Sequence, residues 1–386
     1  MRESTLVLLI LVGTILFTGI ILGATPYLTR KNIQFGIMLP EAVGKSERVK
    51  QWKKQYFIWT VLISILATIP LLVGLIMDKT EDELIHYLAM IGAVLVMMVV
   101  ILNVTLYFKF YRKAKKLKEQ DSASNQRKAE ARVMVSTKFR TEKMAISNGI
   151  FAAMGMFIIV ATGLAPIVLS RQIGAYVPKH WHAGDATEFV SATVGTFVIA
   201  PLIQLLVLGI LMFTNYTFMV TKQLISPKNA VRSLEQNRRY RLAMSKSIVS
   251  IGIGLLLVLA MPQFMMIFNV QSSPLYMAIG LGYMLFTMVI TFYTAIKYGQ
   301  GGERYTPPVH QAGLKPKAGE MLDDDAYWKW GMIYVNPQDP AIFVEKRFGI
   351  GTTINFGRWQ AWAITGVLVI ITVVILVVSM LLSGEG

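Results

Sequence analysis

The sequence predicts an all-α integral membrane protein with eight transmembrane helices and a small cytoplasmic β element between helices seven and eight. Hydrophobic residues make up 54% of the 386 residues and charged residues only 16%, whereas a soluble domain carries about a quarter charged residues. The apolar residues are gathered in long runs, and the basic residues lie between alternate pairs of runs. Cysteine is absent from the sequence, which excludes disulfides and thiol chemistry.

The apolar runs have the length of membrane spans, because a bilayer core about 30 Å thick is crossed by roughly 20 residues of helix. Eight runs lack Asp, Glu, Lys and Arg, and they lie at about 5–25, 56–77, 84–108, 147–170, 189–219, 247–268, 274–296 and 361–382. In lipid each must be a helix that pairs its own backbone amides. They divide the chain into an N-terminal three-helix region (1–146), a central four-helix region (147–296), a cytoplasmic loop (297–360) and a C-terminal helix (361–386).

The basic residues predict the orientation of these spans. All but four of the 38 Lys and Arg residues follow spans one, three, five and seven, and the exceptions are Arg2, Lys79, Arg171 and Lys179. Lys and Arg are retained on the cytoplasmic side during insertion. We therefore expect a multi-pass protein of the cell membrane with both termini outside. The net charge of +16 then faces anionic lipid head groups, and nucleic acid is not an expected partner.

The cytoplasmic loop 297–360 is the one sizeable polar segment that the sequence predicts. It opens with the irregular linker "GQGGERYTPPVHQAGLKPKAGE". Residues 333–335 and 342–344 favour strands on either side of the turn "NPQDP", and "GIGTTINFG" follows as a further short strand. This element is too short for a large core of its own, so we expect it to pack on the inner ends of the helices.

The outer loop "VPKHWHAGDATEF" carries the candidate ligand-binding residues His180, Trp181, His182 and Asp185, and His86 is expected at the same face. In an extended segment residues two apart point the same way, so a cation bound at this loop would take His180 and His182, with Asp185 or His86 as a further ligand. Zinc normally requires three or four such ligands. The preferred interpretation is therefore a loop at the membrane surface, with Trp181 among the head groups. We predict no metal and no cofactor.

The spans contain neutral polar residues only, and three of them are candidate intramembrane sites: Asn103, Gln204 and Asn215. Such a residue either hydrogen-bonds a neighbouring helix, which we favour, or lines a substrate pathway. The sequence shows no motif for intramembrane proteolysis or lipase chemistry. We therefore predict no catalytic residues and no enzymatic activity.

Three stretches resemble a known family. The pattern Pro178-x-His180-Trp181, followed by Gly184, Phe189 and a span with "PLIQ" at 201–204, resembles the "P-x-H-W" membrane domain. That domain is shared by immunity proteins against the sporulation-delaying toxin and by many multi-pass proteins of Gram-positive bacteria. Residues 26–41 and 330–358 resemble the opening and a small C-terminal domain of a subset of these proteins. The chain departs from the pattern at His182, where the family usually has Asn or Asp, and the glycine comes one residue earlier.

The resemblance implies a non-enzymatic role in protection against, or sensing of, membrane-active peptides, as in immunity or envelope stress. Its expected partners are the lipid bilayer and a membrane-active peptide or another membrane protein. The alternative is a transporter, or a membrane subunit of a transport complex, in which Asn103, Gln204 and Asn215 line a pathway.

Overall fold

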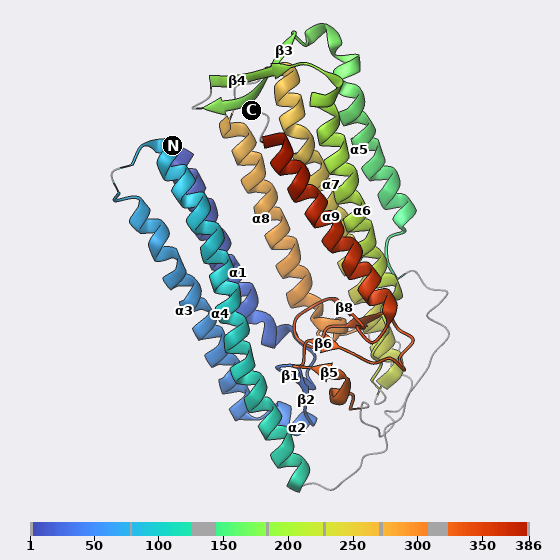
Figure 1. Cartoon of the computed structure of the whole chain (residues 1–386). Coiled ribbons are helices and arrows are strands. Elements are labelled where there is room, and N and C mark those ends of the chain that lie inside the picture. Colours follow the sequence, from blue (N-terminus) through green and yellow to red (C-terminus); the bar gives the residue numbers. More distant parts are fainter. Residues whose placement is uncertain are drawn as a thin grey trace.

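The protein is built mainly of long helices that run side by side (Figure 1). The structure is a computed structural model that describes residues 3–77, 79–124, 144–182, 185–226, 229–269, 273–307 and 323–383. Within these ranges seven helices are long and apolar enough to cross a membrane. They are α1 (Glu3–Leu28), α3 (Glu47–Gly74), α4 (Glu81–Ser124), α5 (Asn148–Val168), α6 (Val194–Val220), α7 (Ala230–Phe268) and α8 (Ser273–Tyr298).

A further apolar helix, α9 (Trp359–Ser383), follows the polar segment after α8. Its stretch Trp359–Val374 is apolar but shorter than the other seven. One predicted span begins later than expected, because residues 185–191 form a strand and α6 begins only at Val194. Thr193 caps this helix, and its hydroxyl accepts a hydrogen bond from the Thr196 amide at 3.4 Å.

The long helices form two bundles. The first bundle consists of α1, α3 and α4, and the second of α5, α6, α7 and α8. Figure 1 shows the first bundle beside α8 of the second. The ring of Phe17 on α1 meets that of Phe292 on α8 edge to face, with centroids 5.1 Å apart. Large apolar side chains cover the outside, including Leu66 and Phe157, as expected of helices whose solvent is lipid.

Close approach of small residues brings α1 against α3. A Cβ atom at Gly19 would lie 2.0 Å from the hydroxyl of Ser64, so no larger residue fits there without moving a helix. Membrane helices often pack through such small residues, since apolar burial gives no drive to associate in lipid. Apolar side chains of the three helices, among them Ile15, Leu71 and Leu95, pack around the contact.

Short strands lie at the two ends of the bundles (Figure 1). The hairpin of β3 (Tyr176–His182) and β4 (Asp185–Ser191) defines what we call the hairpin end. At the opposite end, the cap end, β1 (Ile33–Gln34) pairs with β2 (Ile37–Met38). The short helix α2 (Glu41–Gly44) follows these strands.

We call residues 323–358 the cap. It contains the sheet of β5 (Trp328–Lys329) with β6 (Ile333–Tyr334) and the sheet of β7 (Phe343–Glu345) with β8 (Thr352–Ile354). The turn "NPQDP" joins these two sheets and does not close a hairpin of its own. A parallel bridge from Tyr334 to Asn355 connects them, together with two hydrogen bonds of 2.9 Å between Asn336 and Asn355.

The close contact of α1 with α3 gives a prediction for packing. Replacement of Gly19 by Leu should lower the free energy of unfolding by about 1–3 kcal/mol, because the side chain has no space. Gly13→Leu is the matched control on the same helix, since a Cβ there meets nothing within 4 Å. Thermal unfolding of the purified variants in detergent gives the melting temperature of Gly19→Leu and of Gly13→Leu. Equal melting temperatures for the two variants would contradict this packing.

Candidate functional site

The β3–β4 hairpin places the candidate residues of the outer loop. Its register pairs His180 with Glu188, Trp181 with Ala186 and His182 with Asp185. Val177 fixes the base of the hairpin, because its side chain is 2% exposed. It packs with residues of α5, α6 and α7, namely Ala165, Phe197 and Ile267. The hairpin is therefore attached to three helices of the second bundle.

The side chains of residues 179–188 lie outside the described part of the structure, so the convergence of His180, His182 and Asp185 stays a prediction. His86 is exposed and lies near the start of α4, in the first bundle. Among the described residues, no group of three His, Asp or Glu side chains could hold a metal ion.

Asn215 connects three helices of the second bundle near their cap ends. Its Nδ2 donates to the carbonyl of Ile146 at 2.9 Å and to Oδ1 of Asn148 at 2.7 Å. Its Oδ1 accepts from the hydroxyl of Ser245 at 2.6 Å. The side chain is fully buried, so its hydrogen-bonding capacity is used in holding α5, α6 and α7 together.

Gln204 lies deeper in the same bundle and is also fully buried. Its Nε2 donates to the carbonyl of Leu256 at 2.8 Å and to the hydroxyl of Thr162 at 3.3 Å. Gln263 donates to the carbonyl of the same threonine at 2.6 Å. The Oε1 atoms of Gln204 and Gln263 are buried and lack a partner among the described residues. Gln204 and Gln263 therefore connect neighbouring helices through their Nε2 atoms, and each keeps an Oε1 acceptor without a hydrogen bond among the described residues.

Asn103 performs the corresponding role in the first bundle. Its Oδ1 accepts from the hydroxyl of Tyr56 at 2.7 Å and from that of Thr60 at 3.3 Å. Both donors lie on α3, so Asn103 joins α4 to α3. The geometry of all three predicted amides thus shows contacts between helices.

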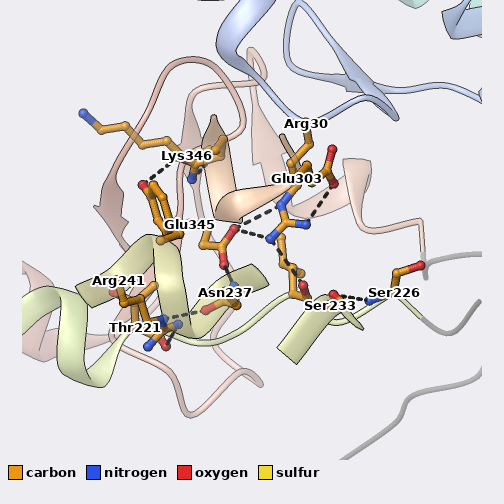
Figure 2. Close-up of polar contacts among 12 residues, drawn as sticks. Arg30, Thr221, Ser226, Ser233, Asn237, Arg241, Glu303, Glu345 and Lys346 are labelled. Atoms are coloured by element: carbon orange, nitrogen blue, oxygen red, sulfur yellow. Dashed lines mark hydrogen bonds and ion pairs between the residues drawn. The ribbon is translucent and has the colours of Figure 1, made fainter. Parts of the chain in front are cut away.

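A buried ionic network at the cap end is a polar feature that the sequence did not single out (Figure 2). Arg30, just after α1, donates from Nε and Nη2 to Oε2 of Glu345 in β7, at 3.0 and 2.5 Å. Its Nη1 reaches Oε1 of Glu303 at 3.1 Å, and Nη2 reaches the carbonyl of Leu224 at 3.2 Å. One guanidinium therefore joins α1, the cap, the segment after α8 and the segment between α6 and α7.

The network continues from Glu345 into the second bundle. Oε1 of Glu345 accepts from Nδ2 of Asn237 on α7 at 2.8 Å, and Oδ1 of Asn237 accepts from Nε of Arg241 at 2.6 Å. Arg241 then donates to the carbonyls of Phe218 and Thr221 at 3.0 and 2.6 Å. Phe218 lies in the last turn of α6 and Thr221 is its C-cap, where a helix carries unpaired acceptors and a partial negative charge.

The arginine at the centre of this network is held in its charged form. Burial alone would lower the pKa of Arg30, but the negative charges of Glu345 and Glu303 outweigh burial and raise that pKa. Arg30 and Glu345 are each 3% exposed. A guanidinium that stays charged offers no proton for acid–base chemistry, and its contacts hold the cap against the helices.

Two glycines after α8 allow close approaches, Gly301 to Arg30 and Gly302 to the main chain of α7. Gly301 has a φ of +63°, and a Cβ there would lie 2.2 Å from Nη2 of Arg30. A Cβ at Gly302 would lie 2.1 Å from the carbonyl oxygen of Gln236. Only glycine fits at these two positions, because any side chain would clash with these neighbours. Residues 300–302 of the predicted linker form a buried 3-10 turn, and residues 308–320 lie outside the described part of the chain.

A second contact joins the cap to the first bundle. The buried Arg347 is paired with Asp324 and Asp325 and donates to the carbonyl of Gly36 at 3.1 Å. Lys118 on α4 reaches the same Asp325 at 2.5 Å. Residues 26–41 and 330–358, which the sequence resemblance had singled out separately, therefore lie against each other at the cap end.

Comparison with known proteins adds little to this description. A model described as a family of unknown function (DUF5808) matches residues 337–362. This match covers the second sheet of the cap and the start of α9. No curated protein matches the chain significantly, and no solved structure does so either.

The ionic network gives a prediction for stability. Glu345→Gln should lower the free energy of unfolding by about 3–5 kcal/mol, because it leaves the Arg30 charge buried without its main partner. Glu47→Gln is the matched control, since Glu47 pairs with Lys50 on the exposed surface and such pairs contribute roughly 0–1 kcal/mol. Melting temperatures in detergent distinguish the two.

A second substitution separates loss of the charge pair from loss of packing. Adding Arg30→Met to Glu345→Gln removes the unpaired charge and should restore part of the lost stability. If the double variant melts no higher than Glu345→Gln alone, the stranded charge is not the cause.

Proposed function

We propose that the chain is a non-enzymatic, multi-pass protein of the cell membrane that protects against, or senses, membrane-active peptides at its outer face. The observation that carries this proposal is the β3–β4 hairpin, whose base at Val177 is buried among three helices of the second bundle. A hairpin attached in this way presents a fixed surface to a peptide that arrives from outside. The resemblance of the Pro178–Trp181 stretch to immunity proteins supports the same role.

The orientation belongs to this proposal. We place the hairpin end outside and the cap end in the cytoplasm, because most Lys and Arg residues lie in the segments at the cap end. In this arrangement α9 is the eighth span, and both termini lie outside. Figure 1 supports the arrangement, since α1 begins and α9 ends at the hairpin end. The β5–β8 strands of the cap are then the cytoplasmic β element.

Transport is the second candidate, and one observation favours it. The buried Oε1 atoms of Gln204 and Gln263 have no partner among the described residues, so they could receive a polar solute. In the protective role these amides serve packing alone. The two functions therefore differ in their dependence on Gln204.

Challenge of cells with membrane-active peptides tests the proposal. Deletion of the gene should lower the inhibitory concentration of some peptides of a broad panel, and the wild-type gene should restore it. A His180→Ala, Trp181→Ala double variant should fail to restore protection while it accumulates normally in the membrane. Gln204→Leu should restore protection fully.

Two outcomes count against protection at the hairpin. Unchanged sensitivity of the deletion strain across the panel would remove the peptide role. Loss of protection with Gln204→Leu, together with normal protection by the hairpin variant, would favour transport.

A further inference from the structure

Two cations of different elements lie beside Tyr27 at the cap end, and neither pairs with a carboxylate of the described residues. Lys53 lies near the start of α3, and Arg304 follows the buried turn after α8. Tyr27, near the end of α1, lies beside both. The three residues therefore come from the two helix bundles and meet where α1 is next to α8.

Arg304 is held in place by main-chain atoms. Its Nη2 donates to the carbonyl of Tyr27 at 2.8 Å, and its Nη1 to the carbonyl of Ile296 at 3.3 Å. Its side chain crosses Gly299, where a Cβ would lie 3.0 Å from Arg304 Cγ. These contacts orient the guanidinium, but they do not neutralise its charge, because a carbonyl carries no net charge.

Lys53 is half-buried, and its Nζ lies 6.0 Å from the centre of the Tyr27 ring. Arg304 is close enough to act on Lys53 with a charge of the same sign. Within the described ranges neither cation forms an ion pair with a carboxylate. The neighbouring Glu303 is engaged elsewhere, with the guanidinium of Arg30 at 3.1 Å and the amide of Lys31 at 2.8 Å.

Two like charges held near each other repel, and an anion between them removes that repulsion. An arginine in a fixed orientation next to a lysine suits a phosphate, since the guanidinium supplies a planar fork and the ammonium a point charge. Ile296 and Tyr293 of α8 are more than half exposed, and Lys297 donates to the Tyr293 hydroxyl at 2.6 Å. Exposed tyrosines beside basic residues are typical of the membrane–water interface.

We infer that Lys53, Arg304 and Tyr27 bind the phosphate of an anionic phospholipid head group in the leaflet at the cap end. This inference rests on the membrane placement made in the proposed function, and it does not depend on the peptide role. The acyl chains lie along the exposed residues of α8. Because the lipid contacts α1, α3 and the segment after α8, it connects the two bundles at their cap ends.

Titration of the full-length protein with lipid tests the inference. The protein is placed in nanodiscs of phosphatidylcholine with increasing phosphatidylglycerol, and its melting temperature is followed. Native mass spectrometry of the detergent-solubilised protein counts the phosphatidylglycerol molecules retained. We expect phosphatidylglycerol to raise the melting temperature. Lys53→Gln should lower the apparent affinity for phosphatidylglycerol about fivefold, which is the effect of one basic residue near an anionic surface. Lys54→Gln is the matched control, because its side chain is exposed on the same helix.

Three results would overturn the assignment. The first is an equal response of the wild type and Lys53→Gln to phosphatidylglycerol. The second is an equal loss in Lys54→Gln, which would indicate general surface charge. The third is saturation of the effect by inorganic phosphate in phosphatidylcholine alone, which would make free phosphate the ligand. Failure of the peptide challenge leaves all three measurements unchanged, so the two proposals can fail separately.

Discussion

Arg30 and Glu345 are separated by 315 residues in sequence, and their side chains meet where water is almost excluded. Removing two charges from water is unfavourable unless each finds full compensation. Here Arg30 donates hydrogen bonds to two carboxylates and a carbonyl, and Glu345 accepts hydrogen bonds from Arg30 and Asn237. The arrangement of the two helix bundles depends on this pair, because its partners belong to both bundles and to the cap. We propose that this pair selects one arrangement of the bundles over others, since a buried ion pair often adds little net stability.

The contacts along the helices explain why such a connection is needed. Within each bundle, apolar clusters and buried amides such as Asn103 and Asn215 hold the helices together. Between the bundles the helices share a narrower contact, in which Phe17 meets Phe292. In lipid, burial of apolar surface gives no drive to close this seam. The ionic network, the Arg347 contact and the proposed phospholipid site all lie at the cap end, so the bundles are joined mainly there.

The sequence predicted the helices well and the ionic network not at all, for one physical reason. Apolar runs report the solvent of a segment directly, so spans such as 56–77 and 247–268 correspond to helices of the structure. The predicted start of the span 189–219 was wrong, because Phe189 and Val190 are apolar residues that suit a strand as well as a helix.

Arg30, Arg241 and Arg347 were treated as residues that set topology, since nothing local distinguishes a buried arginine from an exposed one. The glycines of "GQGGE", between an apolar run and a polar segment, were the available signal for Arg30. Asn103, Gln204 and Asn215 hydrogen-bond to neighbouring helices, whereas the grouping of the outer histidines remains a prediction.

The distance between the bundles tests the central claim most directly. The chain lacks cysteine, so spin labels can be attached at Met90→Cys on α4 and Ile279→Cys on α8, both exposed. A control pair within the first bundle uses Met90→Cys with Ile69→Cys on α3. Electron paramagnetic resonance should give a narrow distance distribution for both pairs in the otherwise native chain. Glu345→Gln should broaden the distribution between the bundles and leave the control pair unchanged. An unchanged distribution between the bundles in Glu345→Gln would contradict the account.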